Sequence, residues 1–217
     1  KFLSSLLVAL MTVSCFAGCG KSESGDVFKI GGIGPTTGGA ALYGQAAMNG
    51  AQIAVDEINA AGGINGYMIE YKFEDDQHDP EKSVNAYNSL KDWGMQMLMG
   101  TVTTTPCIAV TEKTATDGMF QLTPSASSAD VIDPDNVFQV CFTDPNQGTA
   151  SAQYIADNNM ATKIGIIYDS SDVYSSGIEA TFVAEAKARG LEIVATEAFT
   201  ADSKTDFSTP LPTCQDA

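Results

Sequence analysis

The sequence predicts an α/β protein built on a doubly wound parallel sheet, with a first lobe that is near complete and a second that is partial. Short apolar segments alternate with amphipathic helices over most of the 217 residues. Loops rich in glycine, threonine and serine follow several of the apolar segments. This regular alternation is typical of parallel sheets covered by helices, and the length is enough for one or two domains with a buried core.

The first lobe is expected over residues 28–143. Asp79 and Pro80 predict a helix N-cap followed by proline in the first turn, and Gly94 predicts the end of that helix. A turn or short helix is expected near residues 130–134. We expect strands at 28–33, 68–73, 95–99, 119–122 and 137–140, and helices at 44–61, 80–93 and 106–116.

The second lobe is expected over residues 144–217, after a crossing point near residues 142–146. The tail from residue 210 contains two prolines and no periodicity, so it is not expected to complete a domain. Two strands form a marginal unit, which predicts an incomplete lobe. We expect helices at 147–159 and 174–189, and strands at 163–168 and 191–199.

The first 18 residues have the pattern of a secretory signal peptide. Lys1 precedes an apolar run over residues 2–13 that is too short to span a bilayer. The segment from Phe16 to Cys19 resembles a bacterial lipobox, so we expect Cys19 to carry a lipid. Residues 19–27 would be a flexible tether, and the protein would be extracytoplasmic and lipid-anchored to the bacterial cell membrane. An ordinary signal cleaved nearby is the alternative.

The composition excludes some partners. A formal charge of −16 argues against nucleic acid and against charge-driven binding to anionic lipid. Three cysteines follow Cys19, namely Cys107, Cys141 and Cys214, with no metal-ligand spacing. Each is interpreted as a small buried hydrophobic residue, and a Cys107–Cys141 disulfide remains open as an alternative outside the cytoplasm.

No motif predicts enzyme chemistry. The glycines at 32, 34 and 38 are not a dinucleotide fingerprint, because Pro35 and a long loop separate them from the next helix. His78 is the only histidine and is interpreted as a solvated loop residue. The acidic residues at 74–79 are interpreted as a solvated loop rather than a calcium site. We therefore expect no catalytic residue, no cofactor and no metal.

Hydroxyl groups indicate a binding site for a small ligand. Three threonines at 103–105 precede Pro106 at a predicted helix N-terminus, where free N–H groups and the helix dipole suit a carboxylate or phosphate. Simple N-capping is the alternative. A serine-rich loop at 123–128 follows the next strand, and neighbouring parallel strands bring such loops to one edge. Tyr43 and Tyr174 lie at loop–helix junctions of the two lobes.

The order of these motifs resembles the leucine/isoleucine/valine-binding family of type I substrate-binding proteins. The resemblance spans most of residues 28–208. The matching segments are Gly34-Pro35 with Tyr43-Gly44, then Ala46–Gly66, Asp75–Pro80, Gly100–Thr104, Thr123–Ser127 and Tyr168–Gly177.

The resemblance implies a receptor that delivers amino acids, of the branched-chain type, to an ABC importer. Such receptors are not enzymes; they close two α/β lobes on the ligand and pass it to a membrane permease. Thr104 would contact the ligand carboxylate, Ser125 and Ser127 both the carboxylate and the ammonium, and Tyr43 and Tyr174 would flank the ligand. A monomer is expected.

Two features of the resemblance leave alternatives open. Family members are longer, and their acidic ammonium partner lies further along the chain, so we expect a C-terminally truncated protein that cannot close fully. The ligand-sensing domain of a signalling receptor, which shares the fold, and an α/β enzyme are the rival functions. The motifs do not choose between branched-chain amino acids, other amino acids and short amides.

Overall fold

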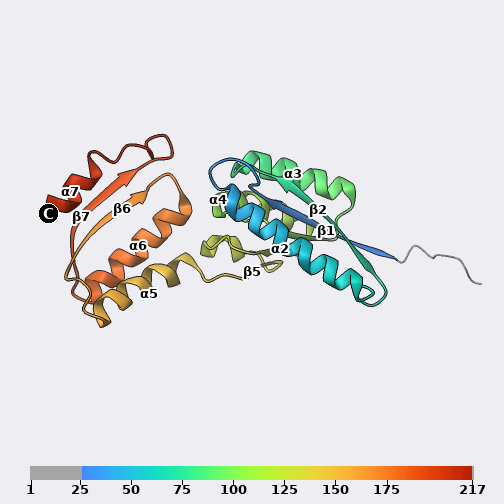
Figure 1. The fold of residues 1–217 in the computed structure, drawn as a ribbon, viewed down its shortest axis with the longest axis horizontal. Helices are drawn as coiled ribbons and strands as arrows, with labels where there is room; N and C mark the ends of the chain where they lie inside the picture. Colours follow the sequence, from blue (N-terminus) through green and yellow to red (C-terminus); the bar gives the residue numbers. More distant parts are fainter. Residues whose placement is uncertain (1–25, 217) are drawn as a thin grey trace, which may run out of the picture.

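The computed structural model describes residues 26–216. The predicted signal peptide, Cys19 and most of the tether lie outside this range. Two α/β lobes follow one another along the chain, and α4 of the first faces α6 of the second (Figure 1). The first lobe contains a five-stranded parallel sheet and the second a two-stranded parallel sheet. The predicted fold class is confirmed.

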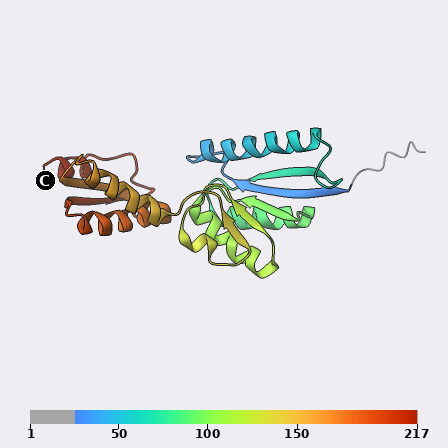
Figure 2. The ribbon, with the colours of Figure 1, turned by 90° about the horizontal axis from the view of Figure 1, so that it is seen from below.

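The first sheet has the strand order β2-β1-β3-β4-β5. The helix α2 lies on one face, and α3 and α4 lie on the other (Figure 2). All strands point the same way, so the loops that follow them meet at one edge. The elements are β1 (Val27–Gly34), α2 (Ala41–Ala60), β2 (Met68–Asp75), α3 (Pro80–Trp93), β3 (Met97–Gly100), α4 (Thr104–Asp117), β4 (Gln121–Thr123), the 3-10 helix η1 (Ala129–Ile132) and β5 (Val137–Gln139).

The main core of the first lobe lies between the sheet and the α3–α4 face. Ile33 and Leu98 come from the two central strands and are fully buried. Leu90 and Tyr87 cover them from α3, and Val110 covers them from α4. Burying each of these side chains contributes about 1.5–3 kcal/mol, so this cluster anchors both helices to the strands whose ends form the edge.

Local signals place the helix α3 as predicted. The Asp79 side chain accepts a hydrogen bond from the Lys82 N–H, Pro80 is the first helical residue, and Gly94 ends the helix in the left-handed conformation. The predicted starts of three other helices are late. Helix α2 begins at Ala41, so Tyr43 lies in its first turn rather than before it. Helix α4 begins at Thr104 rather than 106, and α5 at Asp144 rather than 147.

The second lobe consists of two strands and three helices. The elements are α5 (Asp144–Asp157), β6 (Lys163–Asp169), α6 (Val173–Ala188), β7 (Glu192–Phe199) and α7 (Pro210–Asp216). The tail shows no helical periodicity in its sequence, yet residues 210–216 form α7 against β6 and β7. Both prolines lie in its first turn, where a missing N–H breaks no helical hydrogen bond. Cys214 packs beside Gly165 of β6.

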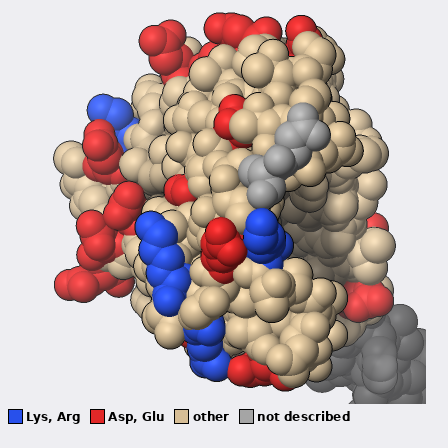
Figure 3. All heavy atoms as spheres, turned by 90° about the vertical axis from the view of Figure 1, so that its left-hand side faces the viewer, with Lys and Arg blue, Asp and Glu red and all other residues tan. Residues whose placement is uncertain are grey.

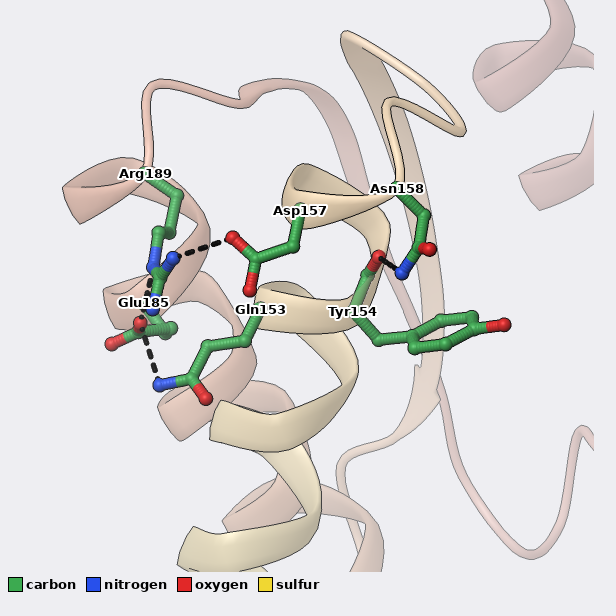
Figure 4. Close-up of polar contacts among 6 residues, drawn as sticks. All are labelled: Gln153, Tyr154, Asp157, Asn158, Glu185 and Arg189. Atoms are coloured by element: carbon green, nitrogen blue, oxygen red, sulfur yellow. Dashed lines mark hydrogen bonds and ion pairs between the residues drawn. The ribbon is translucent and has the colours of Figure 1, made fainter.

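The helices α5 and α6 are joined by polar contacts at their C-terminal ends (Figure 4). Arg189 bonds the Asp157 carboxylate at 2.8 Å and the Glu185 carboxylate at 2.9 Å. Gln153 donates to the same Glu185 side chain at 3.0 Å. On the end of the molecule formed by this lobe, basic side chains lie among acidic ones rather than forming a broad basic patch (Figure 3).

Close packing also joins α5 to α6 through Gly148. A Cβ atom at this position would lie 2.6 Å from the Ile178 carbonyl oxygen and 2.7 Å from the Phe182 nitrogen. We expect Gly148→Ala to lower the free energy of unfolding by about 1–3 kcal/mol, because backbone atoms on α6 would have to move. Urea unfolding followed by circular dichroism measures this change.

Gly50 in α2 provides the matched control. It is also inside a helix, but nothing lies within 4 Å of a Cβ placed there. Gly50→Ala should therefore stabilise the protein by about 0.5–1 kcal/mol through helix propensity alone. Equal effects of the two substitutions would contradict close packing at Gly148.

Candidate functional site

A cavity of about 390 Å³ lies between the two lobes, at the edge where the strands of the first sheet end. The first lobe contributes residues from the loops or helix starts that follow all five strands. The second lobe contributes three residues from the beginnings of α5 and α6. The lining residues are Ala40, Tyr43, His78, Val102, Thr103, Thr104, Ser125, Ser127, Cys141, Phe142, Gln147, Asp172 and Tyr174.

All five residues predicted to bind a ligand line this cavity. Thr104, Ser125 and Ser127 come from neighbouring loops of the first lobe, Tyr43 from the first turn of α2, and Tyr174 from the second lobe. Tyr174 shares a long hydrogen bond of 3.4 Å with Gln147 of α5. The structure thus brings together residues that lie as far apart in the sequence as Tyr43 and Tyr174. Their contact with a ligand stays a prediction.

Hydrogen bonds fix the loop after β3 against the loop after β4. The buried Thr123 hydroxyl donates to the Thr101 carbonyl at 2.6 Å, and the Ser125 hydroxyl donates to the Val102 carbonyl at 2.6 Å. The Ser127 N–H donates to the Thr104 hydroxyl oxygen at 3.2 Å. The Ser125 hydroxyl is therefore committed to the backbone, while the Thr104 hydroxyl accepts one bond and keeps its own proton to donate.

The inner end of the cavity is the part that Thr103, Thr104 and Ser127 line. The buried hydroxyl oxygens of Thr103 and Ser127 have no hydrogen-bond partner within residues 26–216. Helix α4 begins at the same place, and the first N–H groups of a helix have no acceptor within it. Buried polar groups are nearly always satisfied, so this end of the cavity is suited to a polar ligand.

Asp144 was not predicted as part of the site. It is the first residue of α5 and is 2% exposed, and its N–H donates to the Ser127 carbonyl at 2.8 Å. Burial raises the pKa of its carboxyl group, the nearby Ser127 side chain lowers this pKa although the two groups do not meet hydrogen-bond geometry, and the charge of Asp172 raises it. From the sequence, Asp144 was placed only in the segment where the chain crosses from the first lobe to the second. No local pattern reveals that its carboxylate becomes buried.

His78 was predicted to be a solvated loop residue and is indeed exposed, but it also lines the cavity. It follows β2, whose end lies at the same edge as the ends of the other strands. Strand order was the information that sequence reasoning lacked. The backbone of His78 is left-handed, with φ of 62°, and its N–H donates to the Asp76 carboxylate at 2.9 Å.

The acidic loop around His78 holds its own backbone in place. Asp75 accepts hydrogen bonds from the Thr36 N–H at 2.7 Å and from the Thr37 hydroxyl. These bonds lower the pKa of Asp75, although partial burial opposes them. No cluster of three potential metal ligands occurs among the described residues. These carboxylates therefore serve as acceptors that shape the loop.

The three cysteines within residues 26–216, Cys107, Cys141 and Cys214, are free thiols. Cys107 is fully buried, in agreement with its interpretation as a small hydrophobic residue. Cys141 is half-buried and lines the cavity, so the interpretation as a buried residue does not hold there. Its thiol lies 3.5 Å from the Ala126 carbonyl oxygen. The Cys107–Cys141 disulfide is not formed in the structure.

No helix within residues 26–216 is long and apolar enough to cross a membrane.

The raised pKa of Asp144 gives a prediction about stability and pH. The folded protein binds this proton more tightly than the unfolded chain, so the carboxyl group destabilises the fold increasingly as pH rises through its folded pKa. We expect Asp144→Asn to raise the free energy of unfolding at pH 7.5, and the gain to shrink at pH 4.5. Urea unfolding at both pH values measures it.

The exposed Asp92 of α3 provides the control, because Asp92→Asn should change stability little at either pH. A gain from Asp144→Asn that is the same at both pH values would contradict an origin in the buried charge.

Comparison with known proteins identifies the family. Residues 27–217 match the family described as "Periplasmic binding protein". The Leu/Ile/Val-binding protein BraC3 of Rhizobium johnstonii is 33% identical over 208 residues, which cover 95% of this chain and 55% of the relative. The Leu/Ile/Val-binding protein homolog 3 of Brucella melitensis is 33% identical over 210 residues, covering 96% and 55%.

Solved structures give the same result. The branched-chain amino acid transporter substrate-binding protein LivJ from Streptococcus pneumoniae, in complex with isoleucine, has a TM-score of 0.82 at 31% identity. That match covers 88% of this chain and 55% of the other. This chain therefore spans about half the length of the relatives it matches. The chain belongs to the periplasmic binding protein family.

Proposed function

We propose that the protein is the extracytoplasmic substrate-binding component of an ABC importer and that it binds amino acids of the branched-chain type. The observation that carries this proposal is the cavity between the lobes, at whose inner end the start of α4 meets the unpartnered hydroxyl groups of Thr103 and Ser127. The relatives named for binding leucine, isoleucine and valine support the same class of ligand.

The inner end of the cavity suits the charged head of an amino acid. The first N–H groups of α4, with the Thr104 and Ser127 hydroxyls, can bind the α-carboxylate. The ammonium group was expected to need an acid from outside this sequence. Asp144, beside Ser127, and Asp172 now supply negative charge within reach of that end.

The rest of the cavity suits a hydrocarbon side chain. Val102 and Phe142 contribute apolar surface from the first lobe, and Tyr43 lies on the same side. Tyr174 lies opposite on α6. A ligand held between these groups contacts both lobes, so its binding favours their closure by a hinge motion.

The hydrogen bonds favour binding over catalysis. A nucleophilic hydroxyl needs a base within hydrogen-bond reach. The Ser125 hydroxyl instead donates to the Val102 carbonyl, and within the described part of the chain no hydrogen bond joins His78 to a serine or threonine hydroxyl. The proposal therefore assigns no reaction to the site.

The location and partners are part of the same proposal. A lipid on Cys19 and a tether over residues 19–27 would hold a monomeric receptor at the membrane, where a permease receives the amino acid.

The second candidate is the ligand-sensing domain of a signalling receptor with the same fold. The same cavity supports this second candidate. If amino-acid uptake by a permease requires this protein, that result favours the importer.

Ligand binding can be measured by titrating the purified, isotopically labelled chain with leucine and recording amide NMR spectra. We expect saturable shifts at residues that line the cavity. Thr104→Val removes the hydroxyl with little change of shape and should weaken binding about tenfold, because the ligand carboxylate loses a charge-assisted hydrogen bond.

Thr116→Val is the matched control, since Thr116 is exposed in the same helix and far along α4 from its first turn. It should leave leucine affinity unchanged. Shifts confined to residues outside the cavity, or equal losses in the two variants, would contradict the proposed site.

A further inference from the structure

His78 lines the cavity after a different strand from the groups that suit the head of an amino acid. It follows β2, which is the edge strand of the order β2-β1-β3-β4-β5. Thr104 follows β3, so one strand lies between the two positions, and Ser127 follows β4. Neighbouring strands are about 4.8 Å apart, so the β2 and β3 ends are separated by about 10 Å.

The loop that carries His78 is held firmly. Gln77 and His78 both have left-handed backbones, with φ of 55° and 62°. The fully buried Asp76 carboxylate accepts from the His78 N–H at 2.9 Å and from the Ser83 hydroxyl at 2.8 Å. The position of the His78 backbone is therefore fixed by contacts beneath it rather than by its own side chain.

The His78 imidazole makes no hydrogen bond within residues 26–216 and lines the cavity. The lining residues include no lysine or arginine, and the residues next to His78 in strand order are Ala40 and Tyr43, which follow β1. The imidazole and the Tyr43 hydroxyl are therefore the polar side-chain groups available to a ligand beside the end of β2. A branched aliphatic side chain offers the imidazole no acceptor.

The charges around His78 limit the kind of acceptor. Asp75, Asp76 and Asp79 lie on the same loop, and all three carboxylates accept hydrogen bonds from that loop, its neighbour or the start of α3. Asp172 belongs to the other lobe, where it is the N-cap of α6, and it also lines the cavity. A neutral acceptor avoids repulsion from the three nearby carboxylates better than an anionic one does.

We propose that His78 is a specificity-determining residue that donates a hydrogen bond to a carboxamide at the end of the ligand side chain. The inference rests on the part of the proposed function that holds the α-carboxylate at the start of α4, and it replaces the branched-chain side chain of that proposal by a carboxamide. A side chain of two methylenes and an amide, with one hydrogen bond, spans about 8 Å from Cα, which approaches the separation of the strand ends. The glutamine side chain has this length and this amide group, whereas the leucine side chain is shorter and has no hydrogen-bond acceptor.

Calorimetric titration of the full chain with glutamine, norleucine and leucine tests the inference. Norleucine matches the reach of glutamine without its acceptor. His78→Gly removes the imidazole and suits the left-handed backbone, so the fold should be preserved. We expect glutamine to bind more tightly than norleucine, and His78→Gly to weaken glutamine about tenfold while norleucine and leucine change less than twofold.

Gln77→Gly is the matched control, because it makes the same backbone change at the adjacent left-handed position and removes a side chain that does not line the cavity. It should leave all three affinities within twofold. Leucine binding with no effect of His78→Gly on glutamine would overturn this inference alone, as would equal effects of the two glycine variants. Failure of all three amino acids to bind would overturn the proposed function as well.

Discussion

The hydrogen bonds between the loop after β3 and the loop after β4 hold the inner end of the cavity in shape. Hydroxyls of Thr123 and Ser125 reach back to carbonyls of the preceding loop, and the Ser127 N–H reaches the Thr104 hydroxyl. Each bond satisfies a backbone carbonyl or N–H group in one of the two loops. The loops are thereby rigid enough to present the start of α4, while the core of Ile33, Leu98 and Val110 fixes that helix from behind.

The first lobe faces the smaller second lobe, whose nearest parts are the N-terminal ends of α5 and α6. Gln147 and Tyr174 come from their first turns, and the buried Asp144 starts α5. Polar contacts at the opposite ends of the two helices hold them as a pair. Burial raises the pKa of the Asp144 carboxyl group, so a charge there is unfavourable. Under the proposed function, the ammonium group of a ligand nearby would offset that cost and would link binding to the position of the second lobe.

Much of the fold could be predicted because its signals are local. Asp79, Pro80 and Gly94 bound α3 within a few residues of themselves. The start of α4 was misplaced because proline is tolerated within the first turn, so Pro106 does not mark the first residue. Helix α7 was missed because its stability comes from packing on β6 and β7, which no pattern in residues 210–216 reveals.

The candidate site was predicted in part for the same reason. Thr104, Ser127 and Tyr174 belong to motifs that the sequence displays, whereas His78 and Asp144 acquire their places only through strand order and burial. A crystal structure of the chain grown with leucine tests the central claim most directly. The account predicts the ligand carboxylate within hydrogen-bond distance of Thr104 at the start of α4. Leucine bound outside the cavity, or with its carboxylate turned toward His78, would contradict it.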